Sequence, residues 1–407
     1  MRGRIGWSPL IAFILAGCCA PGGPLVRVPP APDIEAARKE NSVIWYTSLR
    51  RETAAKLMKG FRRESGIDVR GFHGSDAALK SRFVGEWTGK KAGADLLQLT
   101  DPGMFADLKA RGLLRRAETP NLLKIPQWLR DSGGFWVASH VVTAVLAYRP
   151  DRLKPGSVPR SWSALADARF RNRLIVPDPA ESGPAFYWAA AMVRLHGWNF
   201  LEALGRNAAA VLPYREAAGR LAAGQAWVSG GLSGEDVWRA GRAGRPVALG
   251  IPAEGVPAIP AAAALPEGAP HPIAGAAFLD FLLSPPAQRI LAGDGFYPAL
   301  PDVRAPAGRT ALNRLRLLQL PWERTARSGE KFRRRLGRSL RAAARSGAMF
   351  PESPGVAGAP RPAGRRARAL RVEPVPAGPV RGGAHPCGGF GFQTAGLQPF
   401  RVSLRSR

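Results

Sequence analysis

The first third of the chain alternates short apolar runs with amphipathic stretches. The run Val43–Trp45 predicts a buried strand, and apolar residues at helical spacing after it predict a helix that ends at Gly66. The same pattern follows twice more, with strands expected at 67–72 and 94–99. Strands that alternate with helices of this length predict a parallel sheet covered on both faces, and hence the α/β class.

Polar side chains stand where these expected strands end. Thr47 and Ser48 follow the first strand, Ser75 follows the second, and Thr100 and Asp101 follow the third. Ligands of open α/β sheets bind outside the carboxyl ends of the strands. The pattern therefore predicts a binding pocket at this edge of the sheet.

Further elements follow from the same periodicities. Leu79, Phe83 and Trp87 mark one face of the second helix, and we expect this face to point inward. Residues 136–148 form a long β-prone run, suited to a strand that crosses from one lobe to another. Additional elements are expected as a helix capped by Ser182, a helix opened by Tyr214, a strand at 226–229 and a basic helix within 324–345.

The chain of 407 residues is too long for one typical hydrophobic core and predicts two lobes. We expect a signal peptide at 1–18, a linker at 19–39, the first part of lobe 1 at 40–138, lobe 2 at 139–248, a return to lobe 1 with C-terminal helices at 249–340, and a basic, low-complexity and disordered tail at 341–407.

The net charge of +29 raises the question of a nucleic-acid partner. The tail contributes 11 arginines and 2 acidic residues, and the remaining excess is dispersed along expected helices. A dispersed excess is typical of a solvated surface, so we expect no nucleic-acid partner. A protein that binds anionic polymers through its basic surface and tail is kept as the alternative function.

The N-terminus has the pattern of an export signal. Arg2 and Arg4 precede a short apolar stretch, and Leu15-Ala16-Gly17-Cys18 resembles the lipobox of bacterial lipoproteins, whose cysteine is lipidated after cleavage. Cys18 would then anchor the protein to a membrane, on its periplasmic or other extracytoplasmic face. An ordinary cleaved secretion signal is the alternative, and both interpretations export the protein.

Several motifs in order along residues 40–305 support a family resemblance. The segment 43–114, with Tyr46-Thr47-Ser48-Leu49 and Leu99-Thr100-Asp101-Pro102, is similar to the ferric-ion-type extracellular solute-binding proteins of bacterial ABC importers. Two later segments, 162–183 and 250–298, are similar to the second-lobe entry and the C-terminal third of that family. The resemblance implies a two-lobed type II periplasmic-binding-protein fold with hinge strands, a small-molecule or ion ligand, an ABC permease as partner and a monomeric protein.

The chain departs from the family's ferric-ion binders at the expected metal ligands. Those proteins use adjacent tyrosines after a second-lobe strand, with a first-lobe histidine and a carboxylate. The corresponding segment 226–232 has no tyrosine, Arg50 stands at the histidine position, and Asp101 matches the carboxylate. Direct iron coordination is therefore doubtful, and Asp101 is the one metal ligand we would assign if iron binds.

Three solute classes stay open: a compound bearing an oxyanion, ferric iron with a chelating anion, and a polyamine. Hydroxyls, helix N-termini and an arginine favour the oxyanion. Thr47, Ser48, Asp101 and Ser182 also stand where a helix needs a cap, so each has a purely structural interpretation. The candidate ligand-binding residues are Thr47, Ser48, Arg50, Ser75, Asp101, Ser182, Tyr187, Tyr214 and Ser229.

The sequence does not favour an enzyme. It contains no H-E-x-x-H, C-x-x-C, G-x-S-x-G or P-loop motif, and its five histidines show no ligand spacing. We therefore expect no catalytic residues and no resident cofactor, with ferric ion only as a transported ligand.

Overall fold

A computed structural model describes residues 28–347 except 90–92, 319 and 321–328. Contacts divide the chain into two units, Met1–Phe350 and Pro351–Arg407, and the described residues all belong to the first. The expected signal peptide with Cys18, residues 19–27 of the linker and nearly all of the basic tail lie outside the described residues.

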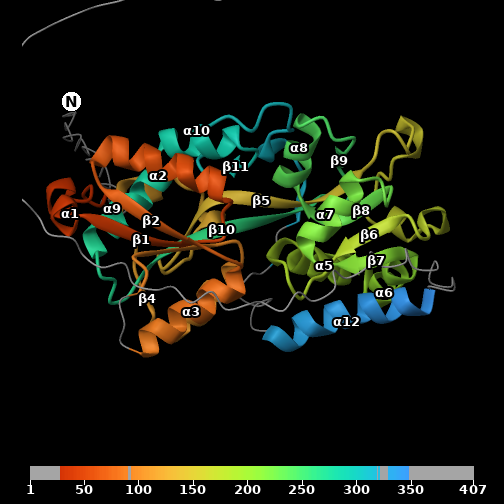
Figure 1. The fold of residues 1–407 in the computed structure, drawn as a ribbon, viewed down its shortest axis with the longest axis horizontal. Helices are drawn as coiled ribbons and strands as arrows, with labels where there is room; N and C mark the ends of the chain where they lie inside the picture. Colours follow the sequence, from red (N-terminus) through yellow and green to blue (C-terminus); the bar gives the residue numbers. More distant parts are fainter. Residues whose placement is uncertain (1–27, 90–92, 319, 321–328, 348–407) are drawn as a thin grey trace, which may run out of the picture. The chain divides into compact units, whose positions relative to one another are not determined.

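The described residues form one mixed sheet of twelve strands (Figure 1). Its main path runs β2-β1-β3-β10-β5-β8-β6-β7. The strands are β1 Ser42–Thr47, β2 Asp68–His73, β3 Leu96–Leu99, β4 Leu114–Arg115, β5 Val137–Tyr148, β6 Leu174–Pro177, β7 Ala208–Leu212, β8 Val228–Ser233, β9 Ala248–Gly250, β10 Val256–Pro266, β11 Tyr297–Pro298 and β12 Leu317–Leu318.

Parallel pairing holds at both ends of this path. β1 pairs in parallel with β2 and β3, as the sequence predicts, and β6 pairs in parallel with β7 and β8. The long strands β5 and β10 lie between these two groups and pair antiparallel with each other. β10 also pairs with β3, and β5 with β8, so these strands join the two groups and the expected crossing strand is confirmed.

We name each group after one of its strands. The β1 side contains β2, β1 and β3, and the β8 side contains β8, β6 and β7 (Figure 1). Helices pack on each group, as expected for buried strands. The helices are α1 Ile34–Glu40, α2 Arg51–Ser65, α3 Asp76–Thr88, α4 Pro102–Ala110, α5 Gly183–His196, α6 Trp198–Asn207, α7 Tyr214–Ala222, α8 Gly234–Arg242, α9 Pro272–Leu282, α10 Pro285–Gly293 and α12 Gly329–Gly347.

Short 3₁₀ turns complete the described elements. They span Pro120–Lys124, Gln127–Leu129, Pro155–Ser157, Ser163–Ala166, Ala168–Phe170 and Leu312–Arg314.

The basic helix expected near the end of the lobes is α12. It packs on α6, α5 and β7, all on the β8 side (Figure 1). Gly205 of α6 allows this close approach, because a Cβ there would lie 2.6 Å from the carbonyl oxygen of Leu340. Leu336 and Leu340 are fully buried on the packed face of α12.

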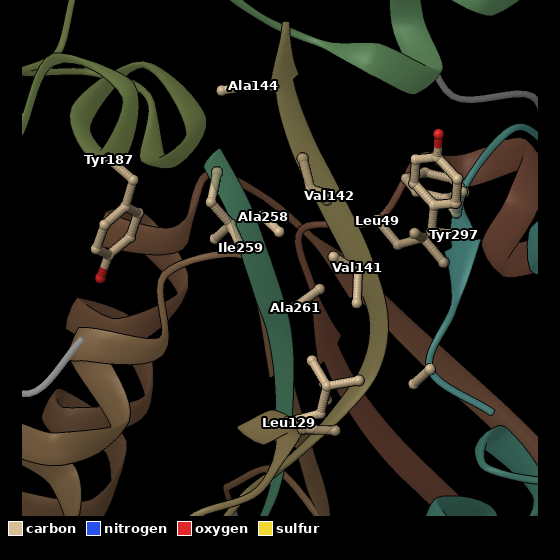
Figure 2. Packing of buried hydrophobic residues seen from close by; sticks show 14 of the residues in the cluster. Leu49, Leu129, Val141, Val142, Ala144, Tyr187, Ala258, Ile259, Ala261 and Tyr297 are labelled. Carbon is tan, nitrogen blue, oxygen red and sulfur yellow. The ribbon is translucent and has the colours of Figure 1, made fainter. Parts of the chain in front are cut away.

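The core follows β5 and β10. Val141 and Val142 of β5 and Ile259 of β10 are buried between the flanking elements (Figure 2). Nearly continuous apolar strands of this kind are expected when helices cover both faces of a sheet. The two sides of the molecule therefore share one hydrophobic core through their joining strands.

Three sequence expectations need correction. Trp87 does not face the sheet with Leu79 and Phe83, because its side chain is 44% exposed at the end of α3. The strand expected at 226–229 is displaced toward its C-terminal side, to 228–233. Residues 34–39, placed in the linker, belong to α1, Ile34–Glu40, which packs on α9.

Candidate functional site

Asp101 stands at the start of α4, where β3 ends. Its Oδ1 accepts the backbone N–H of Gly103 at 3.0 Å, and Pro102 fills the first helical position. Only 4% of the Asp101 surface is exposed. A buried carboxylate needs more partners than one backbone amide, and the structure supplies two of them.

The first additional partner is Tyr187, on the β8 side. Its hydroxyl donates to Asp101 Oδ1 at 2.5 Å and accepts the Gly103 N–H at 3.1 Å. Burial, followed by the nearby Asp101 carboxylate, raises the pKa of Tyr187 well above its ordinary value, so the phenol keeps its proton and acts as a donor. Figure 2 shows the ring extending from its helix with the hydroxyl directed away from β5 and β10.

The second additional partner of Asp101 is Arg333 of α12. Its Nη2 donates to Asp101 Oδ2 at 2.5 Å, and Nη1 donates to the carbonyl oxygen of Pro179 at 3.3 Å. The guanidinium carbon lies 3.9 Å from the ring centroid of Phe186, a cation–π contact. The arginine side chain is only 12% exposed, so its position is well defined by these groups.

Ser48, Thr100 and Asp76 extend this arrangement on the β1 side. Ser48 Oγ lies 3.2 Å from Thr100 Oγ1, and the Thr100 N–H donates to Asp76 Oδ1 at 3.1 Å. Burial raises the pKa of Asp76 to about 6, and the negative charge of Asp101 acts in the same direction. We call the set Ser48, Asp76, Thr100, Asp101, Tyr187 and Arg333 the first polar cluster.

A second polar cluster joins the two sides at Arg50, the residue before the first turn of α2. Its Nη2 and Nε donate to Asp236 Oδ1 of α8 at 2.5 and 3.0 Å. The other Asp236 oxygen accepts the Tyr214 hydroxyl at 2.7 Å and the Ser233 hydroxyl at 3.1 Å. The second polar cluster consists of Arg50, Tyr214, Ser233, Glu235 and Asp236.

Glu235 gives this cluster a titratable group in the neutral range. Burial raises its pKa to about 7, the neighbouring Asp236 carboxylate acts in the same direction, and the Arg309 guanidinium opposes the shift. Burial, followed by the two carboxylates, also raises the pKa of Tyr214 well above its ordinary value. Ser48 and Arg50, two residues apart, thus enter different clusters, and both clusters connect the β1 side to the β8 side.

The chain matches a known protein family. Residues 93–326 match the model of a family described as bacterial extracellular solute-binding proteins, and this match covers more than half of the chain. The chain belongs to that family. Its members are binding proteins of ABC transporters and not enzymes.

Curated relatives of this solute-binding protein share about a quarter of the aligned residues. The probable ABC transporter periplasmic-binding protein y4fP of Sinorhizobium fredii is 25% identical over 149 residues, which cover 34% of this chain and 41% of the relative. Iron uptake protein A2 of Synechocystis sp. is 26% identical over 288 residues, covering 66% and 81%. The chain spans about two-fifths of the length of the first curated relatives that it matches.

Solved structures show the fold. Iron-bound HitA from Pseudomonas aeruginosa superposes with a TM-score of 0.65 at 21% identity, over 73% of this chain and 99% of HitA. AfuA from Actinobacillus pleuropneumoniae, with fructose-6-phosphate bound, gives 0.65 at 19% identity, over 75% and 98%. The solute-binding protein therefore has the two-lobed type II periplasmic-binding fold that its sequence predicts.

The remaining residues predicted for the ligand site lie outside both clusters. Thr47 is fully buried and donates its hydroxyl to Gln98 Oε1, and Ser75 caps α3 at the surface. Ser182 caps α5 through the Ala185 N–H at 3.4 Å. Ser229 lies inside β8 and is fully buried, so the structure does not bring it to either cluster.

Four charged members of the clusters are absent from the sequence-based site prediction. Asp76 immediately follows Ser75, the cap of α3. Glu235 and Asp236 follow the end of β8, so a correct boundary for that strand would have pointed to these two residues. Arg333 has no local signal, because only the packing of α12 brings it to Asp101.

The described residues contain no group of three or more His, Cys, Asp or Glu side chains that could hold a metal ion. Two cavities, of about 460 and 470 Å³, are lined by residues that belong to neither polar cluster. Leu153 and Ile251 line the first, and Trp128 and Leu300 line the second. None of the described helices is long and apolar enough to cross a membrane.

Proposed function

We propose that this protein captures a small solute bearing an oxyanion between its β1 side and its β8 side and delivers it to an ABC permease. The observation that carries the proposal is the convergence of three donors on one carboxylate. The Tyr187 hydroxyl, the Gly103 N–H and the Arg333 guanidinium all point at Asp101.

Such a set of donors suits phosphate or carboxylate oxygens. Charge-assisted hydrogen bonds from arginine are among the strongest in proteins, and a helix N-terminus adds free N–H groups. The N-terminus of α5 faces the same place, because a Cβ on Gly183 would lie 3.4 Å from Asp76 Oδ2. Ser182, which caps that helix, is therefore kept as a proposed ligand contact.

Contacts from both sides explain how binding would close the protein. A solute that touches groups of the β1 side and of the β8 side stabilises the closed arrangement by the difference between its affinities for the two states. The strands β5 and β10, which belong to both sides, are the elements through which the sides would hinge.

Ferric iron held through a chelating anion is the second candidate. Iron appears in the names of several relatives, and Asp101 is the residue that would contribute an oxygen to the metal. Since the described residues offer no three-ligand group, an accompanying anion would have to supply further oxygen ligands. AfuA, whose structure has fructose-6-phosphate bound, supports the oxyanion.

The remaining parts of the proposal concern the setting of the protein. Cys18 is proposed as the lipidated anchor, placing a monomeric protein on the periplasmic or other extracytoplasmic face of a membrane. The relatives described as periplasmic support this location. Labelling of the expressed protein with a fatty-acid analogue, compared with Cys18→Ser, tests the anchor.

The solute is tested by a thermal-shift screen of the full chain against fructose 6-phosphate, citrate, ferric citrate and spermidine, with neutral fructose as the control. A ligand present at about 100 times its dissociation constant stabilises the folded state by about 2.7 kcal/mol. We expect anionic probes to raise the melting temperature. A rise with spermidine alone would contradict the proposal, as would no rise with any probe.

A further inference from the structure

We infer that Arg333, carried by the C-terminal helix α12, is a specificity-determining residue of the solute site. In the absence of solute, the Asp101 carboxylate occupies the position on Arg333 that the solute's oxyanion takes in the complex. This inference rests on the proposed function and names the group that recognises the anion.

Arg333 is held in place by contacts that do not depend on Asp101. Its side chain lies over Phe186 of α5, and its Nη1 donates to the Pro179 carbonyl oxygen. Nη2 is left to reach across to the β1 side. An arginine fixed in this way loses little conformational freedom when one anion on Nη2 replaces another.

The packing of α12 fixes the position of Arg333 along the β8 side. Leu336 and Leu340 are buried against this side, and Arg341 pairs with Asp178 two turns farther along the helix. The position of Arg333 is therefore set by the packing of the helix, independently of the pairing with Asp101.

Asp101 has the chemistry of the ligand it would replace. Its carboxylate is nearly fully buried and accepts the Tyr187 hydroxyl on one oxygen and Arg333 on the other. A carboxylate or phosphate group of a solute could accept the same two donors. Exchange of one oxyanion for another keeps the buried arginine paired, which avoids the large cost of leaving its charge without a partner.

The ligand chemistry is thus a terminal oxyanion, with two sources. A phosphate ester and a carboxylate are separated by comparing fructose 6-phosphate with citrate. Neutral fructose, which keeps the sugar and removes the charge, tests whether the anion is the recognised group.

The experiment measures the binding of these three probes to the full chain by isothermal titration calorimetry, using wild type, Arg333→Gln and Asp101→Asn. Arg333→Gln should weaken binding of the anionic probe by at least about tenfold, since a charge-assisted hydrogen bond is lost. Asp101→Asn keeps an N-cap acceptor but removes the competing charge, so it should tighten binding severalfold.

Arg341→Gln is the matched control, because it removes an ion pair of the same helix with Asp178 and not with Asp101. It should leave binding of the anionic probe within about twofold of wild type, while lowering stability as Arg333→Gln does. A merely structural role of Arg333 would instead give the same binding in both arginine variants.

Each outcome decides between the two levels of the proposal. Unchanged anion binding by Arg333→Gln would overturn the inference and leave the proposed function intact. Weaker binding by Asp101→Asn would show that Asp101 contacts the solute and would overturn its role as the internal anion. If the wild-type protein binds none of the probes, both the inference and the proposed function fail.

Discussion

The Tyr187 hydroxyl donates a 2.5 Å hydrogen bond to the Asp101 carboxylate, although the two residues are 86 positions apart and lie on different sides of the joining strands. Tyr187 belongs to α5 on the β8 side, and Asp101 starts α4 on the β1 side. This bond joins the two halves at the place where the sequence predicts a ligand site.

Tyr187→Phe should lower the free energy of unfolding by about 1–2 kcal/mol, because Asp101 loses a buried partner. It should also reduce the thermal shift caused by the anionic probe. Chemical denaturation and thermal shift measure the two effects. Tyr46→Phe is the control, since its hydroxyl bonds Glu86 within the β1 side; an equal loss of solute response in both variants would contradict the role of Tyr187.

Asp76 should make the protein less stable as pH rises from about 4 to about 6. Its folded pKa of about 6 lies above its ordinary value, so over this interval the unfolded chain releases a proton that the folded protein retains. Asp76→Asn should flatten this part of the profile and gain about 2 kcal/mol near pH 7. Urea unfolding between pH 4 and pH 8 checks this, and an unchanged slope in the variant would contradict it.

Two other groups shape the same profile. The pKa of Glu235 is raised to about 7, so Glu235 also makes the folded protein less stable as pH rises, and it extends this loss toward neutral pH. His140 acts in the opposite sense, because burial lowers its pKa to about 3 and stability is lost as pH falls below its ordinary pKa. Comparison of Asp76→Asn with Glu235→Gln separates the two carboxylates, since Glu235→Gln should change the slope mainly above pH 5.

In the Arg50–Asp236 ion pair, removal of Arg50 should cost less stability than removal of Asp236. The Arg50 side chain is 43% exposed, so Arg50→Gln should cost less than about 1 kcal/mol and its effect should shrink in molar salt. Asp236→Ala also removes the acceptor of the Tyr214 and Ser233 hydroxyls, which should cost about 2 kcal/mol or more. Denaturation at low and high salt measures both variants, and equal costs would contradict the described network.

Gly205→Ala should disturb the docking of α12. The added Cβ would lie 2.6 Å from the Leu340 carbonyl oxygen, so the helix must shift, at a cost of about 1–3 kcal/mol. Because α12 carries Arg333, anion binding should weaken as well. Gly219→Ala is the control, since its Cβ meets nothing within 4 Å on α7 and should gain up to about 1 kcal/mol. If a destabilised Gly205→Ala protein still binds the anion fully, the docking of α12 does not contribute to the site, which would contradict the prediction.

The sequence predicts those parts of the fold that local patterns determine. Apolar runs and helix caps locate β1, β2 and α5 closely, and the polar residues after β1 and β3 include Ser48 and Asp101 of the first polar cluster. Strand ends of parallel units meet at one edge, so such residues can be found without knowledge of the packing.

Ser229 shows where local patterns fail. The sequence ends its strand before Gly230 and Gly231, because glycines carry no side chains that would continue the strand pattern. β8 continues through both, since Trp188 packs so closely that a Cβ on Gly230 would lie 2.5 Å from its ring. The polar residues at the end of this strand are therefore Ser233 and those that follow it. Arg333 depends entirely on how α12 packs, which no local pattern specifies.

Hydrogen–deuterium exchange of the full chain, with and without fructose 6-phosphate, tests the central claim most directly. Capture between the two sides predicts slower exchange at the Gly103 amide on the β1 side and at the first turn of α5 on the β8 side, with no change beside Trp128 and Leu300. Slower exchange confined to the cavity beside Trp128 and Leu300, or on one side alone, would contradict it.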